Sequence, residues 1–257
     1  MKKTGAKKGL GQHFLTDRNI ALKIVDSLQK GKYRTLIEVG PGKGMLTEFL
    51  LNRNEPKFLA VELDRESIDY LLETYTIHKE KFIHADFLKY SLDNLEEPLA
   101  IIGNLPYFIS SQIFFKVLEN RNKVHQVVCM IQKEVAERIA SPHGNKTYGI
   151  LSVLLQAYYT IEYLFTVHEH CFSPAPKVKS AVIRLTRNKT KELNCDPVLF
   201  LKVVKATFNQ RRKMIRNSLR SIFINLPLES ELLSQRPEQL TVDQFTELTN
   251  LVEELNR

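Results

Sequence analysis

The stretch Thr35-Leu36-Ile37-Glu38-Val39-Gly40-Pro41-Gly42-Lys43-Gly44 decides the fold of this 257-residue chain. Its first half is largely apolar, which predicts a buried strand over Thr35–Val39, and a glycine-rich turn follows directly. The next residues, Met45–Leu51, have the pattern of a helix. A glycine turn between a strand and a helix is a common way to bind a nucleotide. The same glycines would also suit a purely structural bend, and both interpretations stay open at this point.

The spacing of these glycines disfavours two familiar nucleotide-binding loops. Gly40, Gly42 and Gly44 follow the pattern GxGxG, and Met45 stands where the dinucleotide fingerprint GxGxxG has its last glycine. A phosphate-binding P-loop is disfavoured because the Gly-Lys pair lies too close to Gly40 and no Ser or Thr follows it. If the turn binds a nucleotide, it therefore belongs to another class of site.

Short apolar runs alternate with amphipathic stretches from Thr35 to about Leu185, which is the pattern of a mostly parallel sheet covered by helices on both faces. Asp17 is placed to cap a helix before the first strand, and another helix is predicted over Gln132–Ala140. The predicted strands are Thr35–Val39, Phe58–Leu63, Phe82–Ala85, Leu99–Gly103, Gln126–Ile131 and Ala181–Leu185. The expected fold class is therefore α/β and Rossmann-like.

A domain boundary is predicted in the polar stretch 187–194, because the strand pattern disappears beyond it. An apolar stripe at helical spacing follows, made of Val204, Phe208, Ile215, Leu219 and Phe223. We therefore expect a catalytic α/β domain over residues 1–190 and a small all-helical domain over residues 191–257.

Composition and charge limit the classes of function. The chain has 37 Lys and Arg against 29 Asp and Glu, and the net charge of +8 favours an acidic partner such as nucleic acid or an anionic membrane surface. No stretch approaches the roughly 20 apolar residues of a membrane span. The three cysteines, Cys129, Cys171 and Cys195, are odd in number and widely separated, which fits neither a disulfide framework nor a zinc knuckle. We expect a soluble cytoplasmic protein without a bound metal.

Two more predicted strands end beside a carboxylate. Glu62, followed by Leu63, can accept both hydroxyls of a ribose, and Asp86, followed by Phe87, can accept from an adenine amino group. Because the carboxyl ends of parallel strands meet at one edge of a sheet, these residues and the glycine turn would share one crevice. Alternatively, Glu62 is a solvated surface charge and Asp86 a helix cap. The combination favours a nucleoside site.

The tetrapeptide Asn104-Leu105-Pro106-Tyr107 follows the fourth predicted strand and indicates the chemistry. An exocyclic adenine amine is a poor nucleophile because its lone pair is delocalised into the ring. The Asn104 side-chain oxygen and the Leu105 carbonyl can each accept one of its N–H bonds. Pro106 stiffens the corner, and Tyr107 offers a flat face for stacking the base. Beside a nucleoside site, this predicts methyl transfer from S-adenosyl-L-methionine to an adenine amine by positioning and electrostatics.

With these motifs in place, the chain resembles the ribosomal RNA adenine dimethyltransferases over nearly its whole length, and within them the small-subunit enzymes of the KsgA/RsmA type. The resemblance rests on Gly11–Leu15, Glu38–Gly44, Glu62–Asp64, Asp86–Phe87, Asn104–Tyr107, Gln132–Ala136, Tyr148–Gly149, Phe172–Val178 and Ser180–Val182. The stretches Phe208–Lys213, Asn217–Leu219 and Arg236–Leu240 are similar to the small-subunit enzymes rather than to the large-subunit enzymes that confer macrolide resistance. The resemblance implies the fold of a class I S-adenosylmethionine-dependent methyltransferase.

The resemblance also implies residue roles. The donor would contact Gln12, His13, Leu15, Gly40, Gly42, Gly44, Glu62, Leu63, Asp86, Phe87 and Asn104. Asn104–Tyr107 would be the catalytic motif, and Phe172 would close over a flipped base opposite Tyr107, unless it is a core aromatic. The chain departs from the usual pattern at Phe108, Ala175 and Lys179, which stand where the family commonly has Asn, Pro and Asp. These departures bear on the shape of the base pocket.

A basic segment supplies the expected RNA contact. Residues 197–228 contain seven Lys or Arg and no Asp or Glu. Arg212, Arg216 and Arg220 repeat every four residues and would form one basic ridge on a helix, which is either a solvated face or a surface that tracks phosphates. The predicted substrate contacts are Tyr107, Phe108, Phe172, Arg211, Arg212, Lys213, Arg216 and Arg220.

The implied reaction is dimethylation at N6 of two adjacent adenines in the 3′-terminal hairpin loop of small-subunit (16S) rRNA, with S-adenosyl-L-homocysteine as product. The expected partner is this rRNA within the 30S particle, for a monomeric enzyme active in subunit biogenesis. One alternative is a large-subunit (23S) methyltransferase of the macrolide-resistance type. The other is an assembly factor that binds RNA without catalysis.

Overall fold

The computed structural model describes residues 13–53, 57–220, 222–223 and 230–255. The chain divides into two compact units, the first made of residues 1–136 and 161–187 and the second of residues 137–160 and 188–257. The second unit thus contains a segment, Glu137–Thr160, that was expected in the N-terminal domain. Its C-terminal part begins at Asn188, close to the boundary predicted at residue 190.

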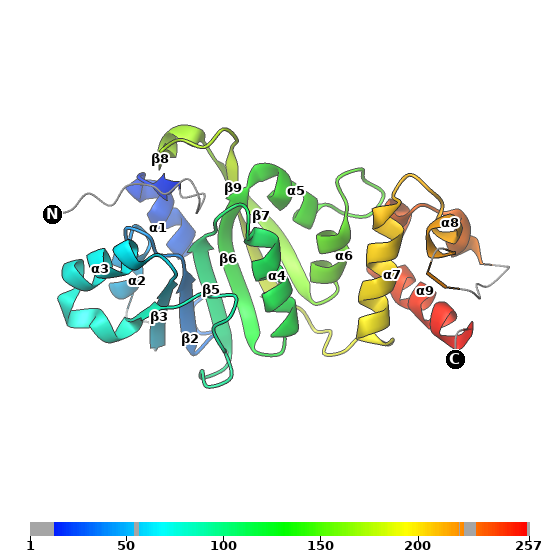
Figure 1. The fold of residues 1–257 in the computed structure, drawn as a ribbon, viewed down its shortest axis with the longest axis horizontal. Coiled ribbons are helices and arrows are strands. Elements are labelled where there is room, and N and C mark those ends of the chain that lie inside the picture. Colours follow the sequence, from blue (N-terminus) through cyan, green and yellow to red (C-terminus); the bar gives the residue numbers. More distant parts are fainter. Residues whose placement is uncertain (1–12, 54–56, 221, 224–229, 256–257) are drawn as a thin grey trace. The chain divides into compact units, whose positions relative to one another are not determined.

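A seven-stranded sheet organises the first unit (Figure 1). Its strands are β2 (Thr35–Val39), β3 (Lys57–Glu62), β4 (Phe82–His84), β5 (Leu99–Asn104), β6 (Val124–Gln132), β7 (Tyr159–Val167) and β9 (Ser180–Arg187). Their order is β4-β3-β2-β5-β6-β9-β7; the first five strands in this order run parallel to one another, and β9 runs antiparallel to β6. All six predicted strands are confirmed, and so is the mostly parallel Rossmann-like sheet.

Three strands were not predicted. β7 (Tyr159–Val167) lies at the edge of the sheet, and apolar and polar residues alternate along it except at Leu164, so its sequence carried a strand pattern that the prediction missed. β1 (Phe14–Leu15) and β8 (Phe172–Ser173) pair with each other in a separate antiparallel sheet. Two residues are too few for any periodic pattern, so this long-range pair could not be found from the sequence.

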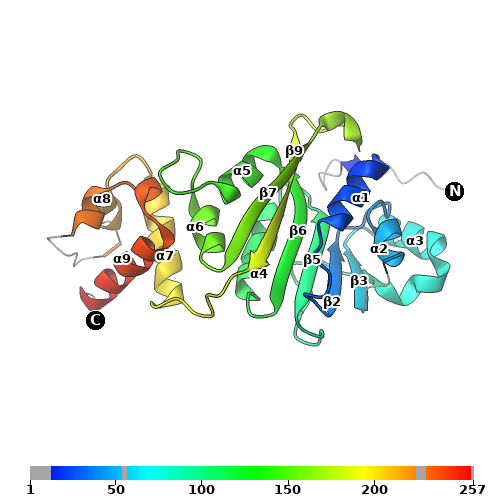
Figure 2. The same ribbon diagram turned by 180° about the vertical axis from the view of Figure 1, so that it is seen from behind.

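Helices cover both faces of the sheet, as predicted. α1 (Arg18–Asp26), α2 (Thr47–Leu51) and α3 (Arg65–Thr74) share one apolar core with the sheet, and α1 is seen over that face in Figure 2. α4 (Ser110–Glu119) covers the face turned to the viewer in Figure 1. The predicted cap of the first helix is confirmed, because the Asp17 carboxylate accepts hydrogen bonds from the N–H groups of Asn19 and Ile20.

The second unit is helical apart from the start of β7, within the described residues. Phe208 stacks on Phe245 and contacts Tyr148 edge-on, and these contacts join α7 (Pro197–Asn209), α9 (Val242–Leu255) and the segment before α6 (Ile150–Gln156). The remaining helices of the described residues are α5 (Lys133–Ala140) and α8 (Ile215–Leu219), with 3₁₀ turns η2 (Thr76–Lys81), η3 (Glu169–Cys171), η4 (Glu231–Ser234) and η5 (Pro237–Gln239). No helix in the described ranges is long and apolar enough to cross a membrane.

The predicted ridge of Arg212, Arg216 and Arg220 on one helix is wrong. α7 ends at Asn209, and Met214 has an extended backbone (φ −63°, ψ 149°), so a separate short helix begins at Ile215. The break has a physical cause in the packing of Ile215, whose side chain is fully buried and whose N–H donates to the Gln235 carbonyl. Arg212 lies in the connecting turn, and only Arg216 and Arg220 lie in or directly after α8.

Candidate active site

The order of the strands places a crevice between β2 and β5. After β2, the next strands along the chain, β3 and β4, lie on one side of β2, whereas β5 lies on its other side. The direction in which strands are added therefore reverses between β2 and β5. Ligands of open α/β sheets bind at the carboxyl ends of the strands at such a switch point. The glycine turn after β2 and the tetrapeptide that begins at the end of β5 therefore meet there, because Glu38 and Ile102 are in register.

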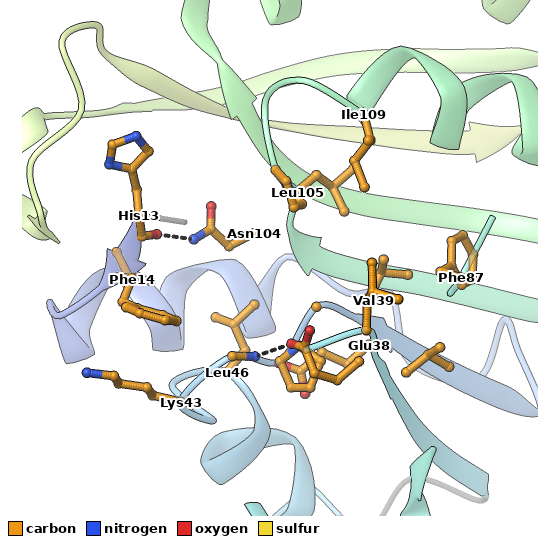
Figure 3. A pocket seen from close by; sticks show the side chains of 18 of the residues that line it. His13, Phe14, Glu38, Val39, Lys43, Leu46, Phe87, Asn104, Leu105 and Ile109 are labelled. Carbon is orange, nitrogen blue, oxygen red and sulfur yellow. Dashed lines mark hydrogen bonds between the residues drawn. The ribbon is translucent and has the colours of Figure 1, made fainter. Parts of the chain in front are cut away.

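A pocket opens at this edge (Figure 3). Of the predicted site residues, it is lined by His13, Leu15, Gly40, Gly42, Glu62, Leu63, Asp86, Phe87, Asn104, Leu105, Pro106, Tyr107 and Phe108. Gly44 and Phe172 do not line it, and neither do the five predicted basic contacts, Arg211, Arg212, Lys213, Arg216 and Arg220. Gln12 lies outside the described residues. Phe14, Glu38 and Lys43 also line the pocket, although they were not among the predicted site residues.

The glycine turn lines the pocket with residues that have no side chain. Gly40 and Gly42 have φ values of 67° and 55°, which only glycine adopts without strain. A Cβ atom on Gly42 would come within 3.0 Å of the Phe14 ring. Gly40 and Gly42 therefore line the pocket without side chains that would occupy it, which favours the nucleotide-binding interpretation of the turn.

The Glu62 carboxylate is hydrogen-bonded to the glycine turn. Its residue is only 7% exposed, and the two carboxylate oxygens accept N–H groups from Gly42 (3.0 Å) and Asp64 (2.9 Å). Burial raises the pKa of Glu62, and these two backbone hydrogen bonds oppose the rise. The alternative of a solvated surface charge is therefore wrong for Glu62. Its fixed oxygens retain lone pairs that can accept ligand hydroxyl groups.

Asp86 and Phe87 lie in a loop that is hydrogen-bonded to α4. The Asp86 carboxylate accepts the Leu88 N–H at 2.9 Å, so it stabilises its own turn as well as lining the pocket. Lys116 on α4 donates from Nζ to the carbonyls of Leu88 (3.0 Å) and Tyr90 (2.7 Å), and it lies over the Phe87 ring. Lys116 thus ties this loop to the helix that follows the tetrapeptide.

Asn104 is oriented by the main chain of a distant segment. Its Nδ2 donates to the His13 carbonyl at 2.9 Å, as the dashed line in Figure 3 shows. With Nδ2 occupied in this way, Oδ1 is the group that Asn104 offers as an acceptor. The next residue, Leu105, is buried, and its N–H donates to the Met130 carbonyl at 3.0 Å on the neighbouring strand. The start of the motif is thus held at both residues.

Tyr107 is also held on two sides. Its hydroxyl lies 2.7 Å from Ser180 Oγ, and Ser180 is completely buried. The His13 ring stacks on the Tyr107 ring with centroids 5.7 Å apart and an interplanar angle of 28°. Burial raises the pKa of Tyr107, so the phenol is neutral at physiological pH. One face of the ring is therefore covered by the protein.

The two other predicted base contacts differ in their placement. Phe108 lines the pocket and is 56% exposed, so its ring is accessible to a ligand there. Phe172 is only 5% exposed, lies in the core that includes α1 and pairs with Leu15 in the small β1–β8 sheet. The structure therefore places Phe172 as a core aromatic and does not bring it to the pocket beside Tyr107.

Glu38 is the main pocket residue that the prediction of site residues missed. It is 1% exposed, and burial raises its pKa to about 8, although the Thr47 hydroxyl donates to it at 2.7 Å. The nearby Glu62 charge raises the pKa further. The signal in the sequence was a carboxylate inside an otherwise buried strand, since ionisable residues are rarely fully buried without a specific reason.

We expect Glu38→Gln to stabilise the protein increasingly as pH rises from 5 to 8. In that interval the unfolded state has lost the Glu38 proton while the folded state retains it, so rising pH lowers the free energy of unfolding of the wild type by up to about 1.4 kcal/mol per unit from this group. Glutamine removes this dependence and still offers an oxygen to Thr47. Urea unfolding at pH 5.5, 6.5 and 7.5 measures the difference. Parallel pH profiles for the two proteins would contradict it.

The predicted basic contacts of the second unit separate into two groups. Arg211 is engaged within the unit, because Nη2 donates to the Asn145 carbonyl at 3.4 Å and Nε lies 3.7 Å from the Glu238 carboxylate. Arg212, Lys213 and Arg220 are exposed, and Arg216 is half-buried. The exposed group is available to a ligand, whereas Arg211 holds the loop 142–146 to the turn η5.

The chain is similar to known proteins over nearly its whole length. The family model described as ribosomal RNA adenine dimethylase matches residues 3–255. The chain is 54% identical over 255 residues to the Ribosomal RNA small subunit methyltransferase A of Cytophaga hutchinsonii, covering 98% of this chain and 99% of that protein. It is 55% identical over 258 residues to the protein of the same name from Bacteroides thetaiotaomicron, covering 99% and 96%.

A solved structure agrees with the fold. A dimethyladenosine transferase from Plasmodium falciparum matches with a TM-score of 0.77 over 92% of this chain and 96% of that chain, at 20% sequence identity. At this identity the match shows the shared fold, and it confirms the predicted class I, Rossmann-like methyltransferase architecture. Because the family model covers almost the entire sequence, the chain belongs to the ribosomal RNA adenine dimethylase family.

Proposed function

We propose that this protein transfers methyl groups from S-adenosyl-L-methionine to the N6 amines of two adjacent adenines in the 3′-terminal hairpin loop of small-subunit (16S) rRNA. The observation that carries the proposal is the orientation of Asn104. Its amide nitrogen donates to the His13 carbonyl, so its oxygen is left as an acceptor in the pocket. The same pocket contains Glu62, whose fixed carboxylate is suited to bind the ribose of a nucleoside. An acceptor fixed in this way suits an amine that must be positioned before it reacts.

The donor half of the pocket fits S-adenosyl-L-methionine. Glu62 presents two fixed carboxylate oxygens for ribose hydroxyls, and Gly40 and Gly42 line the pocket beside it without side chains. Asp86 and the exposed side chain of Leu63 would flank the adenine ring. When bound, S-adenosyl-L-methionine supplies an electrophilic methyl group and leaves as S-adenosyl-L-homocysteine. No residue of the proposed mechanism requires a metal.

The acceptor half would act by positioning and charge stabilisation. The Asn104 oxygen and the Leu105 carbonyl would accept the N–H bonds of the adenine amine, two before the first transfer and one before the second, which directs its lone pair toward the donor and stabilises the positive charge that develops on nitrogen. In each transfer the nitrogen gains the methyl group from sulfur and releases one proton to solvent. Tyr107, neutral and held by Ser180, offers its uncovered face to the adenine ring. No covalent nucleophile of the protein is needed.

The substrate we propose is 16S rRNA within the 30S particle. An adenine in a hairpin loop can be taken out of its stack at a cost of only a few kcal/mol. The exposed Arg212, Lys213 and Arg220 belong to a segment without acidic residues, and such side chains bind phosphates. We propose that the second unit binds the RNA backbone. The protein would act as a monomer in the cytoplasm.

Transfer of labelled methyl groups tests the function. Unmodified small subunits and large-subunit rRNA are incubated separately with labelled S-adenosyl-L-methionine, and the modified bases are mapped. We expect dimethylation of two adjacent adenines near the 3′ end of the small-subunit rRNA. Label on large-subunit rRNA would instead identify an enzyme of the resistance type. RNA binding without label would identify a non-catalytic assembly factor.

The binding of RNA by the second unit can be measured through its salt dependence. We expect a variant with Arg212→Gln, Lys213→Gln and Arg220→Gln to show a shallower slope of log affinity against log salt, by roughly 0.7 to 0.9 for each phosphate that the variant no longer binds. The control variant replaces three exposed lysines of the first unit that do not line the pocket, Lys30, Lys79 and Lys89, by glutamine. Equal slopes for the two variants would exclude the proposed binding of phosphates by these side chains.

A further inference from the structure

His13 belongs to a segment that is fastened across a very long sequence separation. Phe14 pairs with Ser173 in the β1–β8 sheet, and the His13 ring nitrogen Nδ1 lies 2.8 Å from the Pro174 carbonyl. Further along the segment, the Thr16 N–H donates to the Cys171 carbonyl at 2.8 Å. These contacts fix the main chain and the ring of His13 before any ligand binds.

The same residue contacts both ends of the catalytic motif. Its carbonyl oxygen accepts the Asn104 amide at 2.9 Å, and its ring stacks on Tyr107. Figure 3 shows the carbonyl of His13 directed at Asn104 and the His13 ring directed away from the glycine turn and Lys43. A residue whose only role was to contact the donor would have no need of a main-chain carbonyl that binds Asn104 and a ring that stacks on Tyr107.

We propose that His13 is a positioning residue for the acceptor base. This inference rests on the proposed function and assigns His13 a role beyond the donor contact implied by the family resemblance. The carbonyl fixes which atom of Asn104 faces the amine, and the ring covers one face of Tyr107 so that the base stacks on the other. The stack also limits rotation of the Tyr107 ring, whose hydroxyl is held by Ser180.

The role predicts a loss in the rate of transfer rather than in donor binding. Misplacement of reacting groups by about 1 Å can cost on the order of 100-fold in rate. His13→Ala removes the ring and keeps the main-chain carbonyl that binds Asn104, so it tests the ring alone. We expect it to lower kcat about 10- to 100-fold on small subunits, with the Kd for S-adenosyl-L-methionine changed less than about threefold. His13→Phe retains a ring that can stack on Tyr107, and we expect it to recover most of the lost rate.

The experiment compares these two variants with wild type and with His78→Ala, a histidine of the same unit that does not line the pocket. Donor affinity is measured by calorimetry without RNA, and kcat is measured at saturating donor. A weaker donor affinity with unchanged kcat in His13→Ala would overturn the proposal and leave His13 as a donor contact. Equal losses in the Ala and Phe variants would overturn the role of the ring.

A second measurement is independent of turnover. The ring signals of Tyr107, labelled with ¹³C and assigned with Tyr107→Phe, should shift in His13→Ala and return toward their wild-type position in His13→Phe. Unmoved signals in His13→Ala would overturn the proposed stack even if the variant were slow. If the wild type transferred no methyl group, the function would fail, whereas these spectra would still decide whether His13 positions Tyr107.

Discussion

Replacing Asn104 by alanine is expected to lower kcat by about two to three orders of magnitude while donor affinity stays within about threefold of wild type. Loss of one preorganised hydrogen-bonding group at a reacting centre typically costs this much. In this protein the side chain is fixed through its amide nitrogen, so the remaining oxygen does not have to reorient as the reaction proceeds. The loss should therefore appear in kcat rather than in KM for the donor.

Asn19→Ala is a matched control, because Asn19 is exposed on α1 and does not line the pocket. We expect it to retain wild-type kcat. A second variant, Asn104→Asp, keeps an acceptor oxygen but removes the donor to the His13 carbonyl, and it should fall between wild type and Asn104→Ala. Wild-type turnover in Asn104→Ala, measured in the labelled methyl assay, would remove the central observation on which the proposed function depends.

The sequence was sufficient for the parts of the site that depend on regular strands. The glycine turn, Glu62, Asp86 and Asn104 each follow or end a strand whose apolar run is visible in the sequence. Because parallel strands bring their carboxyl ends to one edge, the order along the chain predicted their meeting. The structure places all four at one pocket, although their roles toward the donor and the base stay predictions.

The parts that failed depend on contacts between residues far apart in the chain. Phe172 was expected at the base, but its pairing with Leu15 in a two-residue strand directs it to the core, and no local pattern encodes that pair. The ridge of Arg212 with Arg216 assumed a continuous helix. Helical spacing alone cannot reveal that burial of Ile215 and its hydrogen bond to Gln235 interrupt it.

A substitution at Gly103 tests how rigidly β2 and β5 are packed together where they form the crevice. We expect Gly103→Ala to lower the free energy of unfolding by about 3 kcal/mol or more, because overpacked core positions typically cost about 1 to 3 kcal/mol even where neighbours can move. A Cβ atom here would lie 2.5 Å from the Val39 carbonyl oxygen on β2 and 3.1 Å from a Leu105 methyl group. The carbonyl oxygen belongs to the backbone of a paired central strand, which has no rotamer to change.

The substitution should also change the pocket, because β2 and β5 would have to move apart at their carboxyl ends, where the glycine turn and the tetrapeptide begin. Donor affinity in Gly103→Ala should therefore fall together with stability, which calorimetry and urea unfolding measure on the same sample. Gly149→Ala is the control, because its Cβ would first meet the flexible Arg138 side chain at 3.5 Å, and we expect a cost within about 1 kcal/mol. Equal stability of the two variants would mean that β2 and β5 can separate at little cost, and the crevice between them would then not be a rigid scaffold for the site.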